Sequence, residues 1–263
     1  MTMSFKAVKA SFKQQLIQFT ADPQWIIPSI VAPFLFTAVM LMMYPEKSDT
    51  IVLQAILGGG VLGMWGNTLF ASSFTLSYDR MNGTLDNILM SPSDLYYVIA
   101  GRSLWNTFIG LLNMLLVYIF AKLMFSAPIV IAEPFAFVLI LIVTLLSLAS
   151  IGMLFSLAFV LSRRSYILTS ILEYPIYVLS GAVVPITMLP GWTQPISMAL
   201  APTWGVEALR ASAIPGYETV FGFDMVGNTL MCIALMIAYA ALSWYLMKVI
   251  VRNVLETGSF TRY

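Results

Sequence analysis

Residues Tyr78–Pro92 read YDRMNGTLDNILMSP and form the longest polar interruption in an otherwise apolar chain. Polar and charged side chains, among them Asp79, Arg80 and Asp86, here separate two long hydrophobic runs. We therefore expect this stretch to lie in water between two membrane spans.

A short helix is predicted within this stretch, starting at Gly83-Thr84. Leu85, Ile88 and Leu89 recur at the i, i+3, i+4 spacing that places side chains on one helical face. A short amphipathic helix at the cytoplasmic surface of a membrane protein suggests a docking site for a partner. The alternative is a plain polar loop that joins two spans.

The composition indicates an integral membrane protein. The 263 residues are 60% hydrophobic and only 10% charged, whereas soluble proteins carry about 25% charged residues. Histidine is absent and Cys232 is the only cysteine, which disfavours a metal or haem site and excludes a disulfide within the chain. A net charge of +1 gives no indication of nucleic-acid binding.

Six apolar runs are long enough to cross a membrane, since a spanning helix needs about 20 residues. They are Trp25–Tyr44, Ile51–Ser77, Leu104–Phe125, Pro134–Leu161, Tyr166–Pro185 and Met225–Val251. Residues Ile186–Val220 are moderately apolar but repeatedly interrupted by proline and glycine. We expect them to form a re-entrant hairpin of two short helices. The predicted fold is a single all-α transmembrane domain over residues 1–263.

The first 22 residues predict an amphipathic helix. Its apolar face carries Phe5, Val8, Phe12, Leu16 and Phe19. Lys6, Lys9 and Lys13 flank this face. This pattern is typical of a helix in the membrane interface, with its lysines toward lipid phosphates. The alternative is a soluble helix packed on a partner.

Basic residues in short loops predict the orientation, because they favour the cytoplasmic side. One side carries ten of them: Lys6, Lys9, Lys13, Arg80, Arg102, Arg163, Arg164, Lys248, Arg252 and Arg262. The other side carries three: Lys47, Lys122 and Arg210. Both termini and the Tyr78–Pro92 stretch are therefore expected in the cytoplasm, and the hairpin outside.

Catalytic motifs are missing from the sequence. Without histidine a Ser-His or Cys-His nucleophile is excluded. No lysine follows a glycine, so the chain has no phosphate-binding loop for ATP. Glu173 is the only carboxylate expected inside a span. We expect a non-enzymatic membrane protein whose energy comes from an ion gradient or from a separate ATPase.

Several motifs resemble those of ABC-2-type permeases, in particular the drug-export and nodulation-factor branch. The cytoplasmic loop of that family is similar to Arg80-x-x-Gly83-Thr84-Leu85-Asp86-x-x-Leu89-x-Ser91-Pro92. Its fifth span and outer hairpin resemble Ser180-Gly181, Pro185, Leu189-Pro190-Gly191-Trp192, Ala201-Pro202-Thr203 and Glu207-Ala208-Leu209-Arg210. Met81 departs from the pattern, since the family often has glutamate there.

The resemblance implies the membrane half of an ATP-driven exporter in the inner membrane. Two permease copies, expected as a homodimer, would pair with two ATPase subunits that bind ATP and magnesium. Residues 78–98 would contain the coupling helix that docks on the ATPase. Its apolar edge would fill a cleft, Asp79, Arg80 and Asp86 would form the polar rim, and Gly83 and Thr84 would start the helix.

In the family, spans one, two and five border the translocation route. The corresponding candidates here are Trp25, Phe34, Phe36, Trp65, Asn67, Phe70, Glu173, Tyr174 and Tyr177. Glu173 has two interpretations. It faces the route and favours cationic or hydroxylated substrates, or it is held against a neighbouring helix by Asn67, Asn106 or Asn113.

Three further expectations follow. Gly59 and Gly63 permit close helix approach, more within the subunit than at a dimer seam. Glu207 and Arg210, three residues apart, form a helical pair. The substrate is an amphipathic drug, peptide, lipid or lipid-linked glycan. A second class of function is a self-contained gradient-driven carrier or assembly protein, although such carriers usually show inverted repeats.

Overall fold

The computed structural model describes residues 2–21, 23–43, 49–84, 87–88, 94–125, 131–160, 165–183 and 186–257. Every regular element in these ranges is helical, which confirms the all-α prediction. The α-helices are α1 (Thr2–Ala21), α2 (Pro23–Met43), α3 (Asp49–Met81), α5 (Leu95–Phe125), α6 (Pro134–Val160), α7 (Ser165–Leu179), α8 (Gln194–Ala199), α9 (Ala201–Ala213) and α10 (Met225–Thr257). Two 3₁₀ turns, η1 (Ile186–Met188) and η2 (Gly191–Thr193), precede α8.

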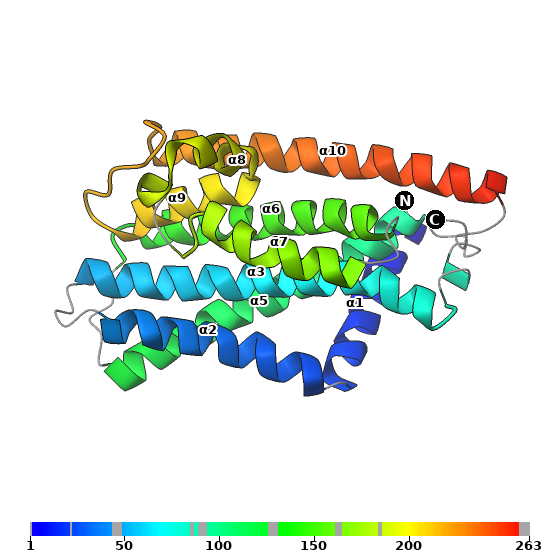
Figure 1. Ribbon diagram of the computed structural model, residues 1–263, viewed down its shortest axis with the longest axis horizontal. Coiled ribbons are helices and arrows are strands. Elements are labelled where there is room, and N and C mark those ends of the chain that lie inside the picture. Colours follow the sequence, from blue (N-terminus) through cyan, green and yellow to red (C-terminus); the bar gives the residue numbers. More distant parts are fainter. Residues whose placement is uncertain are drawn as a thin grey trace.

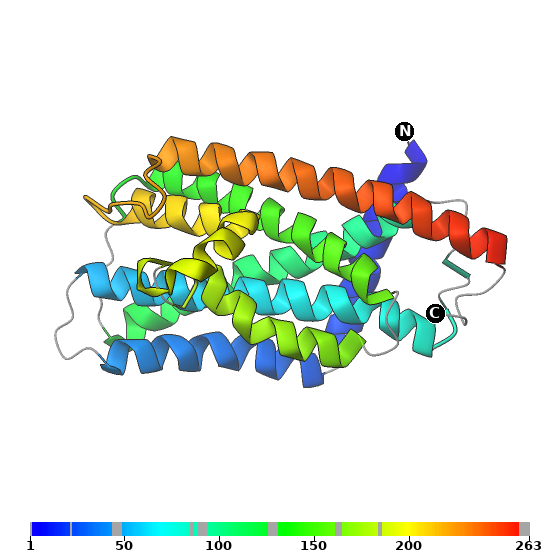
Figure 2. The ribbon, with the colours of Figure 1, turned by 45° about the horizontal axis from the view of Figure 1, so that its top comes forward.

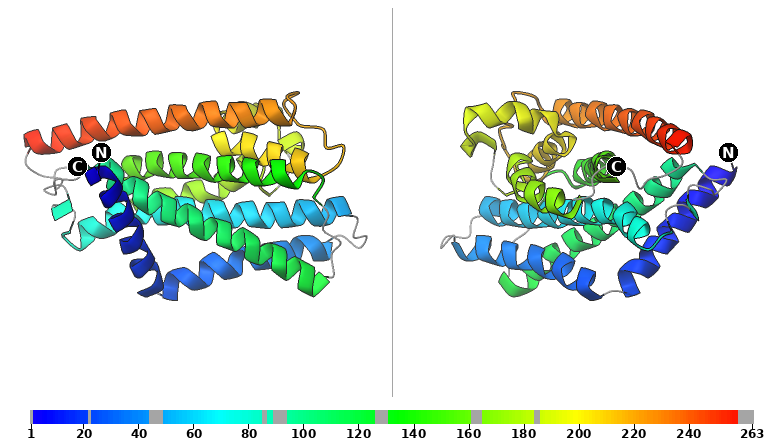
Figure 3. Two further views of the ribbon diagram at one scale, coloured as in Figure 1. Left: turned by 180° about the vertical axis from the view of Figure 1, so that it is seen from behind. Right: turned by 45° about the vertical axis from the view of Figure 1, so that its right-hand side comes forward.

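The long helices form an elongated antiparallel bundle (Figure 1). Helices α2, α3, α5, α6, α7 and α10 run along its long axis, and α1 crosses one end at a steep angle (Figure 3). The far end of α10 lies at the same end as α1, whereas α8 and α9 lie toward the opposite end (Figure 2). Helix α3 is central, because it contacts α2, α5, α6, α7 and α9.

Membrane-spanning character is established for part of this bundle. Within the described residues, three helical segments are long and apolar enough to cross a membrane: Leu95–Met124, Pro134–Leu157 and Met225–Arg252. Helix α2 contributes a shorter apolar segment, Ile30–Met42. The protein is therefore embedded in a membrane through a helical bundle.

Two of the long helices begin at the residues that the sequence predicts. Pro134 starts α6, where a missing N–H costs nothing because the first turn has no partner for it. Met225 starts α10, and Asp224 caps it by accepting a hydrogen bond from the Gly227 N–H at 2.7 Å.

Other helix ends differ from the prediction. Helix α3 continues past Ser77 to Met81, so Asp79 and Arg80 belong to a helix and not to a loop. Helix α5 begins at Leu95 instead of Leu104, because Asp94 caps it through the Tyr96 N–H at 3.1 Å.

Helix α7 is shorter than predicted, because it ends at Leu179 and not at Pro185. Gly181 follows with a φ of +74°, a left-handed conformation that terminates helices and favours glycine. Pro175 lies inside α7 without ending it.

Small residues on α3 allow its neighbours to approach closely. A Cβ at Gly59 would overlap the Thr37 hydroxyl of α2, and a Cβ at Gly63 would lie 2.9 Å from Pro33 Cγ and 3.3 Å from Asn113 Cβ of α5. Close van der Waals packing is what holds helices together in lipid, where the hydrophobic effect is weak. The expectation that these glycines pack within one subunit is confirmed.

Candidate functional site

The connection between α3 and α5 starts from a defined helix cap. Thr84 N–H donates to the Asp79 carbonyl at 2.9 Å, across Gly83, whose φ is +66°. This is the bonding pattern of a helix that ends at a left-handed glycine. Nothing lies within 4 Å of a Cβ placed on Gly83, so there is room for a side chain at this position. The left-handed backbone conformation is therefore the reason that glycine is favoured here.

Asp79 joins three parts of the chain at this point. The Arg102 Nη1 on α5 donates to Asp79 Oδ2, and Thr84 Oγ1 in the connection donates to Asp79 Oδ1 at 3.3 Å. Both charged side chains are buried, with exposures of 4% for Asp79 and 1% for Arg102. The Asp79 carboxylate therefore faces Arg102 inside the subunit, and its role in the polar rim of the coupling site stays a prediction.

The rest of the connection is described in part. Ile88 N–H donates to the Thr84 carbonyl at 3.2 Å. The Ile88 side chain is half-buried and packs on a cluster that includes Leu95, Met153 and Met247. Ile88 thus contacts its own bundle, and its role at the apolar edge of the docking site stays a prediction. Asn82, Gly83, Thr84 and Asn87 are exposed beside it.

Four residues of the predicted coupling site lie outside this description. Leu85, Asp86 and Leu89 are not among the described residues, nor is the side chain of Arg80. Their roles stay predictions.

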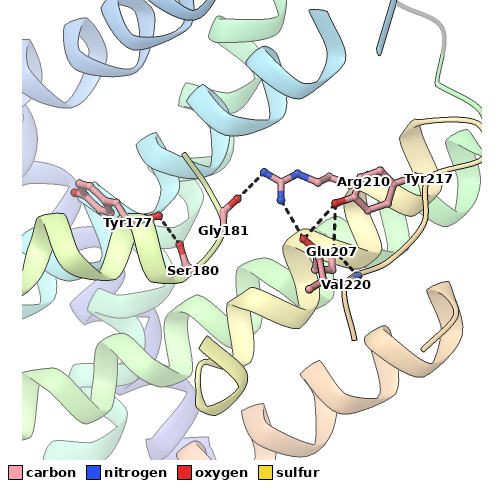
Figure 4. Close-up of polar contacts among 7 residues, drawn as sticks. All are labelled: Tyr177, Ser180, Gly181, Glu207, Arg210, Tyr217 and Val220. Atoms are coloured by element: carbon pink, nitrogen blue, oxygen red, sulfur yellow. Dashed lines mark hydrogen bonds and ion pairs between the residues drawn. The ribbon is translucent and has the colours of Figure 1, made fainter. Parts of the chain in front are cut away.

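A second cluster lies at the opposite end of the bundle, around Glu207 (Figure 4). Arg210 Nη1 donates to Glu207 Oε1 at 3.0 Å, which confirms the predicted helical pair on α9. Arg210 Nη2 also donates to the Gly181 carbonyl at 2.5 Å, just after α7. The Arg210 guanidinium therefore ties α9 to the C-terminal end of α7.

Glu207 also holds the segment that follows α9. Its carboxylate accepts hydrogen bonds from the Tyr217 hydroxyl, at 3.2 Å to Oε2, and from the Val220 N–H at 3.3 Å. Glu207 is fully buried and Arg210 is 2% exposed. A buried charge pair needs further hydrogen bonds to offset its removal from water. The partners named here satisfy the Glu207 carboxylate and both terminal nitrogens of Arg210, whereas Arg210 Nε has no hydrogen-bond partner among the described residues.

Burial and the nearby Glu207 carboxylate raise the pKa of Tyr217 from 10.0 to about 12. Removal from water disfavours the charged phenolate, and the negative charge on Glu207 disfavours it further. The Tyr217 hydroxyl is therefore a hydrogen-bond donor to Glu207 at neutral pH.

The helices predicted to border the translocation route are neighbours, because α3 contacts both α2 and α7. On α2, Phe34 packs edge-on to Phe120 at 5.0 Å between ring centroids, and Phe36 lies half-buried near Gly58. On α7, Tyr174 is 71% exposed and its ring lies 6.2 Å from that of Tyr177.

Two α3 candidates point inward. Trp65 is fully buried in the main core cluster with Leu148 and Ile176, and its role as a lining residue stays a prediction. Asn67 is buried and donates to the Gly63 carbonyl of its own helix at 2.8 Å. The side chains of Trp25, Phe70 and Glu173 lie outside the described residues.

Sequence reasoning missed two buried carboxylates and two buried cations, Arg102 and Arg210. It treated Glu173 as the only carboxylate in the interior, whereas Asp79 and Glu207 are both buried. It counted Arg102 only as a cytoplasmic charge, whereas Arg102 lies within α5 and pairs with Asp79. A lone arginine flanked by apolar residues indicates such a buried partner.

A surface cavity of about 550 Å³ lies next to the Glu207 cluster. Its lining includes Glu133, Tyr217, Glu218, Phe223 and Asp224, and none of the predicted route residues. Among the described residues, the two ion-paired centres lie at opposite ends of the bundle, one at the α3–α5 connection and one at the C-terminal end of α7.

Comparison with known proteins agrees with this architecture. No curated protein matches the chain. A family model described as ABC-2 type transporter matches residues 6–214, which run from the first turns of α1 to the end of α9. The chain therefore belongs to the ABC-2 type transporter family, the membrane permease components of ABC transporters, which work with an ATPase partner.

Proposed function

We propose that the chain is the permease subunit of an ATP-driven exporter and that the α3–α5 connection couples it to the ATPase. The observation that carries this proposal is the Asp79 junction. A capped helix end, an exposed connection and a second helix meet at one buried carboxylate. Movement of the connection by the ATPase would therefore displace α3 and α5 together.

The same proposal includes the topology. Helices α2, α3, α5, α6, α7 and α10 are the six spans, α1 lies in the interface, and η1 to α9 form the outer re-entrant hairpin. The antiparallel order and the shared location of α1 and the α10 end support it, because an even number of crossings returns the chain to its starting side (Figure 1). We place that side in the cytoplasm of a cell with the protein in its inner membrane.

Two copies of the permease, as a homodimer, and two ATPase subunits form the transporter in this proposal. ATP and magnesium bind to the ATPase and not to this chain. The route lies beside α2, α3 and α7, where Tyr174 exposes an aromatic ring. An amphipathic drug, peptide, lipid or lipid-linked glycan is the proposed substrate. Family membership favours this over a self-contained carrier.

Docking is tested by Leu85→Asp and Leu89→Asp, which place a charge on the predicted apolar edge. Each variant should insert into the membrane at wild-type level but lose co-purification of the ATPase and substrate export. Met188→Asp is the matched control, because Met188 is 72% exposed at the opposite end of the bundle. Normal export by both Leu variants would refute docking through this edge.

A further inference from the structure

Helix α1 presents a basic face that nothing in the described chain covers. Lys6, Lys9 and Lys13 are all exposed and lie within one side of the helix. Residues Thr2–Ala21 contain no Asp or Glu. Among the described residues, no carboxylate forms an ion pair with these lysines.

The opposite side of α1 is occupied by the bundle. Ser11 and Gln15 are buried, and Phe12 packs edge-on to Trp105 of α5 at 5.1 Å between ring centroids. A Cβ at Gly101 would collide with the Val8 carbonyl, so this glycine lets α1 lie directly on α5. The basic face is therefore held outward by packing.

Apolar side chains remain exposed beside the lysines. Phe5 is 72% exposed and Ile17 is 55% exposed. An exposed aromatic ring next to several lysines is costly in water, but it is typical of a helix lying between lipid headgroups and acyl chains. The composition of this face thus matches a membrane surface better than bulk water.

The height of α1 on the bundle agrees with this. Gly101 lies about 9 Å along α5 from Leu95, at 1.5 Å per residue. The apolar segment Leu95–Met124 has 30 residues, so it is about 45 Å long and exceeds a hydrocarbon core of about 30 Å at both ends. Helix α1 crosses α5 toward the end that begins at Leu95, with contacts at Gly101 and Trp105 (Figure 3).

We propose that Lys6, Lys9 and Lys13 form a binding surface for anionic phospholipid headgroups. Their positive charges pair with lipid phosphates, while Phe5 and Ile17 enter the acyl layer. The proposal rests on the placement of α1 in the interface, and its test needs no ATPase, so it can fail or succeed independently of the coupling proposal.

The test compares binding of phosphatidylglycerol and phosphatidylcholine, at equal concentrations, to the purified full chain by native mass spectrometry. Wild type should retain phosphatidylglycerol preferentially. Each lysine near an anionic surface contributes roughly a fivefold factor in affinity, so the Lys6→Gln/Lys9→Gln/Lys13→Gln variant should lose this preference by tenfold or more. Thermal unfolding should show the same pattern, because phosphatidylglycerol should stabilise only the wild type.

Two controls separate charge from folding. The Lys6→Arg/Lys9→Arg/Lys13→Arg variant should keep the preference, and so should Lys122→Gln, which removes an exposed lysine from the last turn of α5. If the triple Gln variant does not fold, the three single Gln variants should each lower the preference.

An unchanged phosphatidylglycerol preference in the Gln variants would overturn the proposal. Loss of ATPase co-purification with that preference intact would also overturn it, and would assign this face of α1 to the ATPase.

Discussion

Asp79 near the end of α3 and Arg102 in α5 form a buried ion pair, although 23 positions separate them in the sequence. The pair connects α3 and α5 at the root of the segment that joins them. In the coupling role proposed above, this junction would carry force from the ATPase into the bundle.

Asp79→Asn should destabilise the protein, because it leaves the Arg102 charge buried without a counter-charge. Breaking a buried pair from one side costs about 3–5 kcal/mol. Thermal unfolding of the purified chain, followed by tryptophan fluorescence, measures this loss.

The double variant Asp79→Asn/Arg102→Met should recover most of that stability, because no unpaired charge remains. Export driven by the ATPase should stay impaired, because the connection is no longer held to α5. Full recovery of export in the double variant would mean that the pair serves stability alone.

Glu207→Gln should destabilise the end of the bundle that contains α8 and α9. The substitution keeps the size of the side chain but leaves the buried Arg210 without its counter-charge, and we expect a loss of about 3 kcal/mol. Glu218→Gln is the matched control, because Glu218 is exposed in the same segment and should stay within about 0.5 kcal/mol of wild type. Equal effects of the two variants would contradict the clamp role of Glu207.

Tyr217 should ionise near pH 12, well above the ordinary value of 10.0. The difference in absorbance at the tyrosinate band between wild type and Tyr217→Phe, followed as pH rises, isolates this one phenol. A midpoint near 10 would mean that Tyr217 is not held against Glu207.

The same shift predicts how stability depends on pH. Because the pKa of Tyr217 is raised in the folded state, its contribution is fully present below about pH 10 and is lost as pH rises toward 12. The Tyr217→Phe variant should lack this part of the alkaline decline, as measured by unfolding at fixed temperature.

Gly59→Ala should destabilise the α2–α3 contact by about 1–3 kcal/mol, because the new methyl group overlaps the Thr37 hydroxyl. Adding Thr37→Ala should recover part of the loss by removing that hydroxyl. Gly191→Ala serves as the control, because nothing lies within 4 Å of a Cβ there. A neutral Gly59→Ala would contradict the close approach of the two helices.

Helix content and the main helix starts were predictable from the sequence, because they depend on local features. Long apolar runs specify helices in a membrane, where every backbone group must bond within its own segment. Pro134 and the Asp224–Met225 junction begin α6 and α10 for reasons that involve only neighbouring residues. The predicted start of α5 was wrong although Asp94 is a local cap, because the prediction followed the apolar run and not the capping residue.

The burial of Asp79, Arg102, Glu207 and Trp65 depended on tertiary structure. Periodicity shows which side chains share a helical face, but not which distant helix covers that face.

The Tyr78–Pro92 stretch illustrates the difference between what local sequence determines and what tertiary packing decides. Its sequence determined that a polar break with a glycine turn separates two apolar helices. The antiparallel packing of α3 on α5 decided that its first carboxylate, Asp79, points inward to Arg102 and not outward to a partner. The physical reason is that a charge so far from water is stable only beside an opposite charge, and packing alone brings that charge within reach.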